Sequence, residues 1–171
     1  MKNIILLAST LFLFAFTNNQ DTEYKAENEG WEVNIEKAYE ISKKTGKPIL
    51  ANFTGSDWCG WCKKLKREVF DQQEFKDWAK ENVVLVELDF PRSKQIPDDI
   101  KAQNNSLRQA FNVMGYPTIW VFYLTKGAEN QQMNIEALGK TGYVAGGPSA
   151  FTGGVDQMIE AYNKQKAQGS N

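Results

Sequence analysis

The chain has 171 residues, a length that allows one domain with a hydrophobic core. Its formal net charge is −1, so no basic excess is present to neutralise nucleic-acid phosphates, and we expect no nucleic-acid partner. It contains no histidine, which excludes Ser-His-Asp and Cys-His catalysis and removes the commonest metal ligand, so we expect no metal site either.

The amino terminus has the pattern of an export signal. Lys2 is followed by an almost unbroken apolar run from Ile4 to Phe16, which suits a signal peptide and is shorter than the roughly 20 residues that span a bilayer. An internal apolar helix is the alternative, but the polar residues after the run argue against it. We therefore predict a signal peptide over residues 1–20 and an exported protein, periplasmic or secreted, in a compartment where disulfides persist.

Residues 31–163 have the pattern of one domain, with no internal repeat. The polar residues 21–30 before it are expected to form a flexible leader, and residues 164–171 a polar tail that frays. Within the domain, apolar spacings of three and four residues indicate helices, and short apolar runs indicate strands. The predicted order is a helix over 35–45, a strand over 49–53, helices over 59–69 and 71–80, a strand over 83–89, a helix over 99–112, strands over 117–124 and 133–138, and a closing helix that includes 155–162.

Local signals set several of the predicted ends. Asn34 is suited to cap the first helix, and Gly46 is suited to end it. The run from Asp71 to Glu74 has the form of a capping box, and the glycines within 139–154 indicate a loop around Tyr143. Strands that alternate with helices indicate a parallel sheet, to which the last hairpin adds an antiparallel strand. The fold class is therefore α/β, with a central mixed sheet of about four strands flanked by helices.

Both cysteines of the chain lie between the first predicted strand and the next helix, in the sequence Trp58-Cys59-Gly60-Trp61-Cys62-Lys63. A Cys-x-x-Cys pair at such a junction indicates a redox-active pair. Cys59 is at the amino end of the helix, where the helix dipole and the unpaired N–H groups favour a thiolate. Cys62 is one turn further along, close enough to form a disulfide with Cys59 and to resolve a mixed disulfide formed there.

Three other roles for the cysteine pair stay open. A purely structural disulfide would close a very small loop and would therefore stabilise the fold weakly. A zinc site would need further Cys or His ligands, which the sequence lacks. Two buried free thiols are the third alternative, which an oxidising compartment disfavours.

The motif resembles that of the thioredoxin superfamily when it is taken together with the order of elements and with Gly115-Tyr116-Pro117-Thr118 before an apolar strand. The resemblance extends from about Trp31 to Tyr162, and is greatest to exported thioredoxin-like proteins and to the C-terminal domain of the bacterial transmembrane disulfide reductase. It implies a thioredoxin-like fold and a cis peptide bond before Pro117 that faces the cysteines. The alternatives are a proline that only begins a strand and tryptophans that belong to the core. The resemblance also implies a substrate-binding surface made of Trp58, Gly60, Trp61, Tyr116 and Pro117.

The chain departs from the thioredoxin pattern at the buried acid. Asn52 stands where the pattern has an Asp near the end of the strand before the motif, and an amide cannot take a proton from Cys62. Glu87 interrupts the apolar run of the next strand at a position that should point toward the site. Our hypothesis is that Glu87 replaces the Asp as proton acceptor, so the candidate catalytic residues are Cys59, Cys62 and Glu87. The alternative is an outward Glu87 on the strand surface, and the other nearby acid, Asp57, is expected to be exposed.

These features favour a thiol–disulfide oxidoreductase that exchanges the Cys59/Cys62 dithiol with disulfides of exported proteins, without a bound cofactor. The resemblance to reductase domains, and the lack of His between the cysteines, favour a reductant. A reductant in an oxidising compartment needs electrons from elsewhere, so we expect a membrane protein as electron donor and a monomer as the working form. The alternatives are a disulfide oxidase or isomerase, a binding module with an idle disulfide, and a peroxide-detoxifying enzyme that uses the same thiols.

Overall fold

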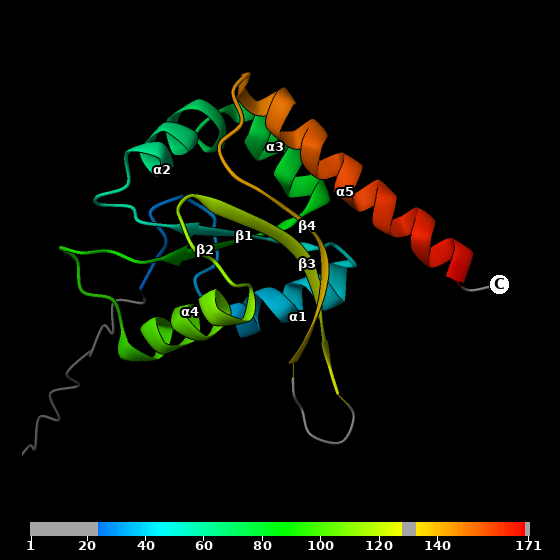
Figure 1. The fold of residues 1–171 in the computed structure, drawn as a ribbon, viewed down its shortest axis with the longest axis horizontal. Helices are drawn as coiled ribbons and strands as arrows, with labels where there is room; N and C mark the ends of the chain where they lie inside the picture. Colours follow the sequence, from blue (N-terminus) through cyan, green and yellow to red (C-terminus); the bar gives the residue numbers. More distant parts are fainter. Residues whose placement is uncertain (1–23, 128–132, 170–171) are drawn as a thin grey trace, which may run out of the picture.

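The computed structural model of the protein describes residues 24–127 and 133–169 (Figure 1). The predicted signal peptide over residues 1–20 lies outside the described residues. Within the described ranges, no helix combines the length and the apolar character that are needed to cross a membrane.

A four-stranded mixed sheet forms the centre of the fold, in the order β2-β1-β3-β4. β1 (Ile49–Thr54) is parallel to β2 (Val84–Asp89) and antiparallel to β3 (Thr118–Lys126), which pairs with the antiparallel β4 (Met133–Thr141). The predicted α/β class with a mixed sheet of four strands is therefore confirmed. The direction of β3 differs from the expected parallel one, because the connection through α4 (Asp98–Ala110) leaves β2 and enters β3 at the same end of the sheet.

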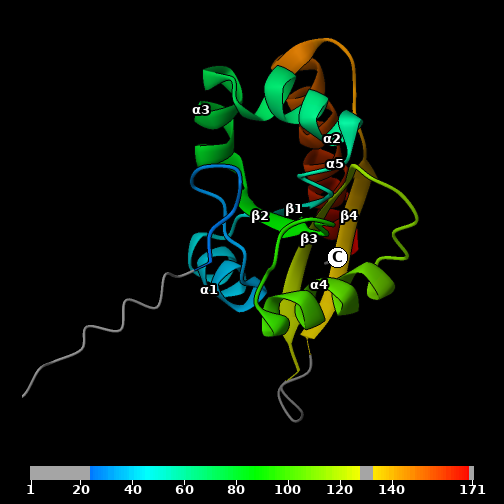
Figure 2. The same ribbon diagram turned by 90° about the vertical axis from the view of Figure 1, so that its left-hand side faces the viewer.

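Helices cover both faces of the sheet, and the two views in Figures 1 and 2 show the same separation. α1 (Ile35–Thr45) and α4 lie on one face. The other face carries α2 (Gly60–Leu65) with its π-helical continuation η1 (Lys66–Phe70), followed by α3 (Gln73–Asn82) and α5 (Gly147–Gly169).

Alternation along the strands divides the core into two clusters. In β1, Leu50 belongs to the cluster beneath α2, α3 and α5, whereas Ile49 and Phe53 belong to the cluster beneath α1 and α4. In β2, Leu85 packs against the first cluster and Val86 belongs to the second. The same alternation directs four buried polar side chains toward α2: Asn52, Thr54, Glu87 and Asp89.

The ends of α1 follow the sequence signals. Asn34 Oδ1 accepts hydrogen bonds from the backbone N–H groups of Glu36 (2.9 Å) and Lys37 (3.1 Å). Gly46 adopts a φ of 74°, a conformation that favours glycine, and its N–H donates to Ser42 O at 2.8 Å. Both predicted ends of this helix are therefore confirmed.

The predicted capping box at residues 71–74 is wrong. α3 begins after Gln72, whose side chain makes no capping hydrogen bond. The Asp71 carboxylate instead accepts a hydrogen bond from Lys66 Nζ.

The closing helix is longer than predicted at both ends. α5 begins at Gly147, so Gly153 and Gly154 lie inside a helix rather than in a loop. Their neighbours Phe151 and Val155 are buried in the core, which holds this stretch helical despite the two glycines. Residues 164–169, expected to fray, continue the same helix.

Candidate active site

The two cysteines form a disulfide at the start of α2. Cys59 is the N-cap of the helix, with an extended backbone, and its Sγ accepts a 3.1 Å hydrogen bond from the N–H of Cys62. Both residues are buried, each with 6% of its surface exposed. The motif therefore lies where the sequence predicted, between the carboxyl end of β1 and the amino end of a helix.

The peptide bond between Tyr116 and Pro117 is cis, as the resemblance implied. Pro117 directly precedes β3, in which Thr118 is paired with Phe53 near the carboxyl end of β1. The proline loop and the disulfide thus lie at the same end of the sheet. Tyr116 also contacts Trp58 edge to face, with the ring centroids 5.7 Å apart.

Trp58 forms one wall of the site and is held on several sides. Its Nε1 donates to the carbonyl oxygen of Phe90 at 2.9 Å, and the guanidinium carbon of Arg92 lies 3.9 Å from the ring centroid. Gly55 lies so close to the ring that a Cβ there would be 2.4 Å from it. The position of Trp58 therefore depends on a glycine that sequence reasoning did not single out.

Trp61 forms a second, exposed part of the surface, with 57% of its area accessible. Its ring lies 5.1 Å from that of Tyr143, and Lys64 Nζ lies 5.0 Å from the Trp61 ring and 4.8 Å from the Tyr143 ring. Gly60 is exposed between the cysteines. The predicted substrate-binding residues thus form two groups around the disulfide: Trp58, Tyr116 and Pro117 on one side, and Gly60 and Trp61 within the motif.

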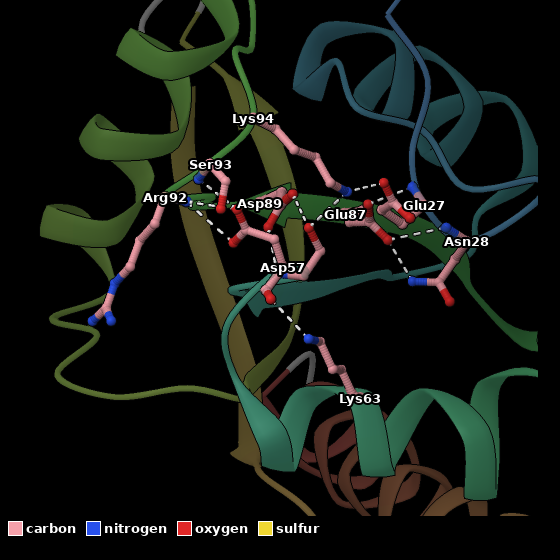
Figure 3. Close-up of polar contacts among 10 residues, drawn as sticks. Glu27, Asn28, Asp57, Lys63, Glu87, Asp89, Arg92, Ser93 and Lys94 are labelled. Carbon is pink, nitrogen blue, oxygen red and sulfur yellow. Dashed lines mark hydrogen bonds and ion pairs between the residues drawn. The ribbon is translucent and has the colours of Figure 1, made fainter.

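Glu87 is buried, with 2% of its surface exposed, so the outward-facing alternative is wrong. In the pairing of β1 with β2 it lies opposite Asn52. One carboxylate oxygen accepts from the backbone N–H of Glu27 at 2.7 Å (Figure 3). The other accepts from the backbone N–H of Asn28 at 3.2 Å and from its side-chain amide. Glu27 and Asn28, which belong to the segment 21–30 expected to form a flexible leader, are therefore bound to the domain through this carboxylate.

Cys62 and Glu87 line the same small cavity, whose volume is about 40 Å³. Asn28 and Asn52 also line it, and the Oδ1 atom of each is buried and accepts no hydrogen bond from residues 24–127 or 133–169. A buried carbonyl oxygen without a partner costs about 1–3 kcal/mol. The structure thus places Glu87 and Cys62 in the lining of one cavity.

Burial raises the pKa of Glu87 above its ordinary value. The hydrogen bonds from Glu27 and Asn28 act in the opposite direction, because they favour the charged carboxylate, while the nearby charge of Asp89 raises the pKa further. The net direction is upward, which brings the carboxyl closer to the range in which it exchanges a proton near neutral pH.

Asp89, which sequence reasoning did not select, is a second buried acid on the same face of β2. Its carboxylate accepts from the backbone N–H of Ser56 at 2.9 Å and from the Ser56 hydroxyl at 2.5 Å. It thereby fixes the loop that leads into the motif. The signal that could have identified it is its spacing of two residues from Glu87, which places both side chains on one face.

Asp57 is not simply exposed, because its carboxylate binds the loop after β2. It accepts from the backbone N–H of Ser93 at 2.6 Å and from that of Arg92 at 3.0 Å. These hydrogen bonds, that from Ser93 first, lower the pKa of Asp57 to about 2. The carboxylate thereby holds the loop at the position from which the Arg92 guanidinium covers Trp58.

A metal centre finds no support in the part of the chain that the structure describes. No three His, Cys, Asp or Glu side chains are grouped there in a way that could hold a metal ion. The arrangement is instead that of a dithiol site, with a disulfide, a cis proline beside it and a buried carboxyl behind it.

Comparisons with known proteins agree with this arrangement. The model of the thioredoxin-like domain family matches residues 35–134. The chain is 38% identical over 126 residues to the disulfide bond reductase DsbH of Chlamydia pneumoniae, which covers 74% of this chain and 75% of that protein. It is 30% identical over 95 residues to the thiol:disulfide interchange protein DsbD of Actinobacillus pleuropneumoniae, 56% of this chain but 15% of that protein.

A solved structure named DsbH oxidoreductase superposes with a TM-score of 0.67 and 32% sequence identity, over 79% of this chain and 87% of that one. The family model and the DsbH relative each cover more than half of the chain, and the matched region contains both cysteines and Pro117. The chain therefore belongs to the thioredoxin-like domain family, in which its Cys59–Cys62 pair makes it a thiol–disulfide oxidoreductase.

Proposed function

We propose that this oxidoreductase is a reductant that acts outside the cytoplasm and reduces disulfides of exported proteins. The observation that carries the direction is the 38% identity to a relative named as a disulfide bond reductase. The apolar run that follows Lys2 supports export, to the periplasm or beyond the cell. Electrons would come from a membrane protein, and one chain holds every group that the reaction needs, so we propose that it works as a monomer.

The reaction follows from the position of the two thiols. The Cys59 thiolate attacks one sulfur of a substrate disulfide, forms a mixed disulfide and releases the first substrate thiolate. The Cys62 thiolate then attacks Cys59 Sγ, which restores the disulfide seen here and releases the second substrate thiolate. The substrate gains two electrons and the enzyme loses two. Cys59 at the helix N-cap is suited to the first step, and Cys62, which faces the inner cavity, to the second.

The surface around the disulfide is suited to an extended polypeptide. Pro117 has no N–H, whereas the backbone of Tyr116 can pair with an extended chain. The exposed ring of Trp61 offers apolar contact on the motif itself. We propose that the substrate-binding residues are Trp58, Gly60, Trp61, Tyr116 and Pro117.

Glu87 is proposed to take the proton that Cys62 must lose before it attacks. The support is geometric, because Glu87 and Cys62 line one cavity of about 40 Å³, and the pKa of Glu87 is raised by its burial. The proton leaves the Cys62 thiol for the Glu87 carboxylate, and the electron pair left on sulfur forms the new bond to Cys59.

Single-cysteine variants test the assignment of the two steps. Cys62→Ala should accumulate a mixed disulfide with a reducible protein such as insulin, because Cys59 attacks and nothing resolves the product. Cys59→Ala is the matched control and should trap at least tenfold less. Mass spectrometry of the products after thiol blocking measures both. Equal trapping by the two variants would contradict the assignment.

Glu87→Gln should slow the resolving step at neutral pH. The amide cannot accept a proton, and general base catalysis contributes roughly 100-fold or more to such steps, so a loss of at least tenfold is expected. The loss should shrink as the pH rises and Cys62 ionises without help. Stopped-flow fluorescence of the mixed-disulfide decay measures it. A wild-type rate throughout the neutral range would remove Glu87 from the mechanism.

A further inference from the structure

The segment 24–28 lies before the region that matches the thioredoxin-like family, yet it completes the surroundings of Glu87. Within the described residues, the hydrogen bonds donated to the Glu87 carboxylate all come from Glu27 and Asn28 (Figure 3). Two come from backbone N–H groups and one from the Asn28 side chain. A segment remote from the motif in sequence therefore supplies the direct partners of the acid proposed to serve Cys62.

Asn28 is built into the fold rather than resting on its surface. It has 6% of its area exposed, and its backbone carbonyl oxygen accepts a hydrogen bond from the N–H of Trp31 at 3.3 Å. Its neighbour Glu27 is contacted by Lys94 Nζ, which also donates to the Ser56 hydroxyl at 3.2 Å. The segment is thus tied to the loop that carries the cysteines as well as to β2.

The Asn28 side chain has two ends with different surroundings. Its Nδ2 donates to the Glu87 carboxylate. Its Oδ1 is buried and accepts no hydrogen bond from residues 24–127 or 133–169. Asn28 also lines the cavity that Cys62 lines. One side chain therefore both donates to the Glu87 carboxylate and belongs to the lining of the cavity that Glu87 shares with Cys62.

The Asn28 amide is the donor to Glu87 that a substitution can remove, because the other two donors are backbone N–H groups. Hydrogen bonds donated to a carboxylate favour its charged form, whereas burial favours the neutral form. Of the nearby cations, Lys63 Nζ donates to the Asp57 carbonyl at 2.7 Å and Lys66 Nζ contacts Asp71. The titratable groups that face Glu87 or line its cavity come from three segments, namely the leading segment, α2 with η1, and β2: Tyr24, Glu27, Cys62, Lys63, Lys66 and Asp89.

We propose that Asn28 is a positioning residue of the redox site, which holds the Glu87 carboxylate in its charged form and so sets the pH above which Cys62 is deprotonated through it. The proposal rests on the proposed function of Glu87. It makes the residues before the family domain part of the active site. Removal of the amide would leave Glu87 with two donors in place of three, and its pKa would rise.

Carbon-13 NMR of the Glu87 side-chain carboxyl in the reduced protein tests the proposal directly. Asn28→Leu removes the donor at similar volume and should raise the titration midpoint of Glu87 by about one pH unit, the equivalent of one charge-assisted hydrogen bond. Asn28→Ser keeps a hydroxyl donor and should raise it less, and it also serves if the leucine variant does not fold. Lys25→Gln, an exposed change in the same segment, should leave the midpoint in place. An unchanged midpoint in both Asn28 variants overturns the proposal.

The pH profile of the resolving step separates this inference from the role of Glu87. Asn28→Leu should move the midpoint of that profile upward by the same amount, and should have no such effect in a Glu87→Gln background. A shift of equal size in that background overturns the proposal, because Asn28 would then act by another route. A wild-type pH profile in Glu87→Gln would contradict the proposed role of Glu87 as proton acceptor. If Asn28→Leu still moved the titration midpoint of the Glu87 carboxyl, the effect of Asn28 on that carboxyl would nevertheless be supported.

Discussion

Glu87 and Asp89 lie on the same face of β2 and bind different segments of the chain. Glu87 accepts hydrogen bonds from residues 27 and 28, and Asp89 accepts them from Ser56 in the loop before the motif. Each acid is almost fully buried, and a buried carboxylate is costly unless such donors are present. The two side chains therefore fix, from one strand, both the leading segment and the loop that positions the cysteines.

The place of Asn52 opposite Glu87 in the sheet suggests why this position holds an amide. The acid that the thioredoxin pattern places on β1 is here on β2, and the neutral amide is its direct neighbour. Two carboxylates at these positions would repel each other, so one would be protonated through much of the neutral range. The Asn–Glu pair thus keeps a single ionisable carboxyl at these two facing strand positions.

Asn52→Asp tests this reading of the pair. The two carboxyl groups should titrate together, with one apparent pKa raised by at least about one unit above that of Glu87 in the parent protein. The resolving step should slow at pH values below that raised pKa, because the pair then already holds a proton. Carboxyl NMR titration measures the first effect and stopped-flow kinetics the second. Independent titration of both groups near pH 4 would contradict the account.

Most elements of the fold could be predicted from the sequence, because their signals are local. The spacing of apolar residues located the helices, and the caps of α1 at Asn34 and Gly46 follow from residue type. The direction of β3 could not be predicted, since alternation of strands and helices does not reveal at which end of the sheet α4 returns the chain. The extent of α5 was missed because its glycines indicate a loop, whereas burial of Phe151 and Val155 decides the outcome.

In the candidate site too, some features could be predicted from the sequence and others could not. The cysteine pair, the cis proline loop and the inward direction of Glu87 were accessible from a motif or from strand alternation. The contact between Asn28 and Glu87 joins residues 59 positions apart and follows no periodic pattern. The same holds for the close approach of Gly55 to Trp58, which depends on the ring's packing and not on the local sequence.

Two glycine substitutions should have opposite effects on stability. Gly55→Ala would place a Cβ 2.4 Å from the Trp58 ring and should lower the free energy of unfolding by about 1–3 kcal/mol, with loss of activity as the ring moves. Gly153→Ala, with nothing within 4 Å of its Cβ in α5, should raise it by about 0.5–1 kcal/mol. Urea denaturation of both variants measures the effects. Equal stability of the two variants would contradict the packing described for Trp58.

At the scale of the whole molecule, the fold gathers three separate segments at one end of the sheet. β1 ends there and leads into the cysteine loop, β3 begins there after the cis proline, and β2 brings Glu87 and Asp89 to the same region. The helices on the α2 side cover this region, and Cys62 and Glu87 line one small cavity beneath them. The proposed division into an attacking Cys59 and a resolving Cys62 follows from the place of Cys59 at the N-cap of α2 and of Cys62 in the lining of this cavity.

The reduction potential of the Cys59–Cys62 pair tests the central claim most directly. Equilibration of the protein with glutathione or dithiothreitol buffers, followed by thiol trapping and mass spectrometry, measures it. A reductant of this family should lie below about −200 mV, toward the value of about −270 mV known for thioredoxin. A potential near −120 mV, as in a strong oxidant, or a disulfide that does not exchange with the buffer at all, would contradict the claim.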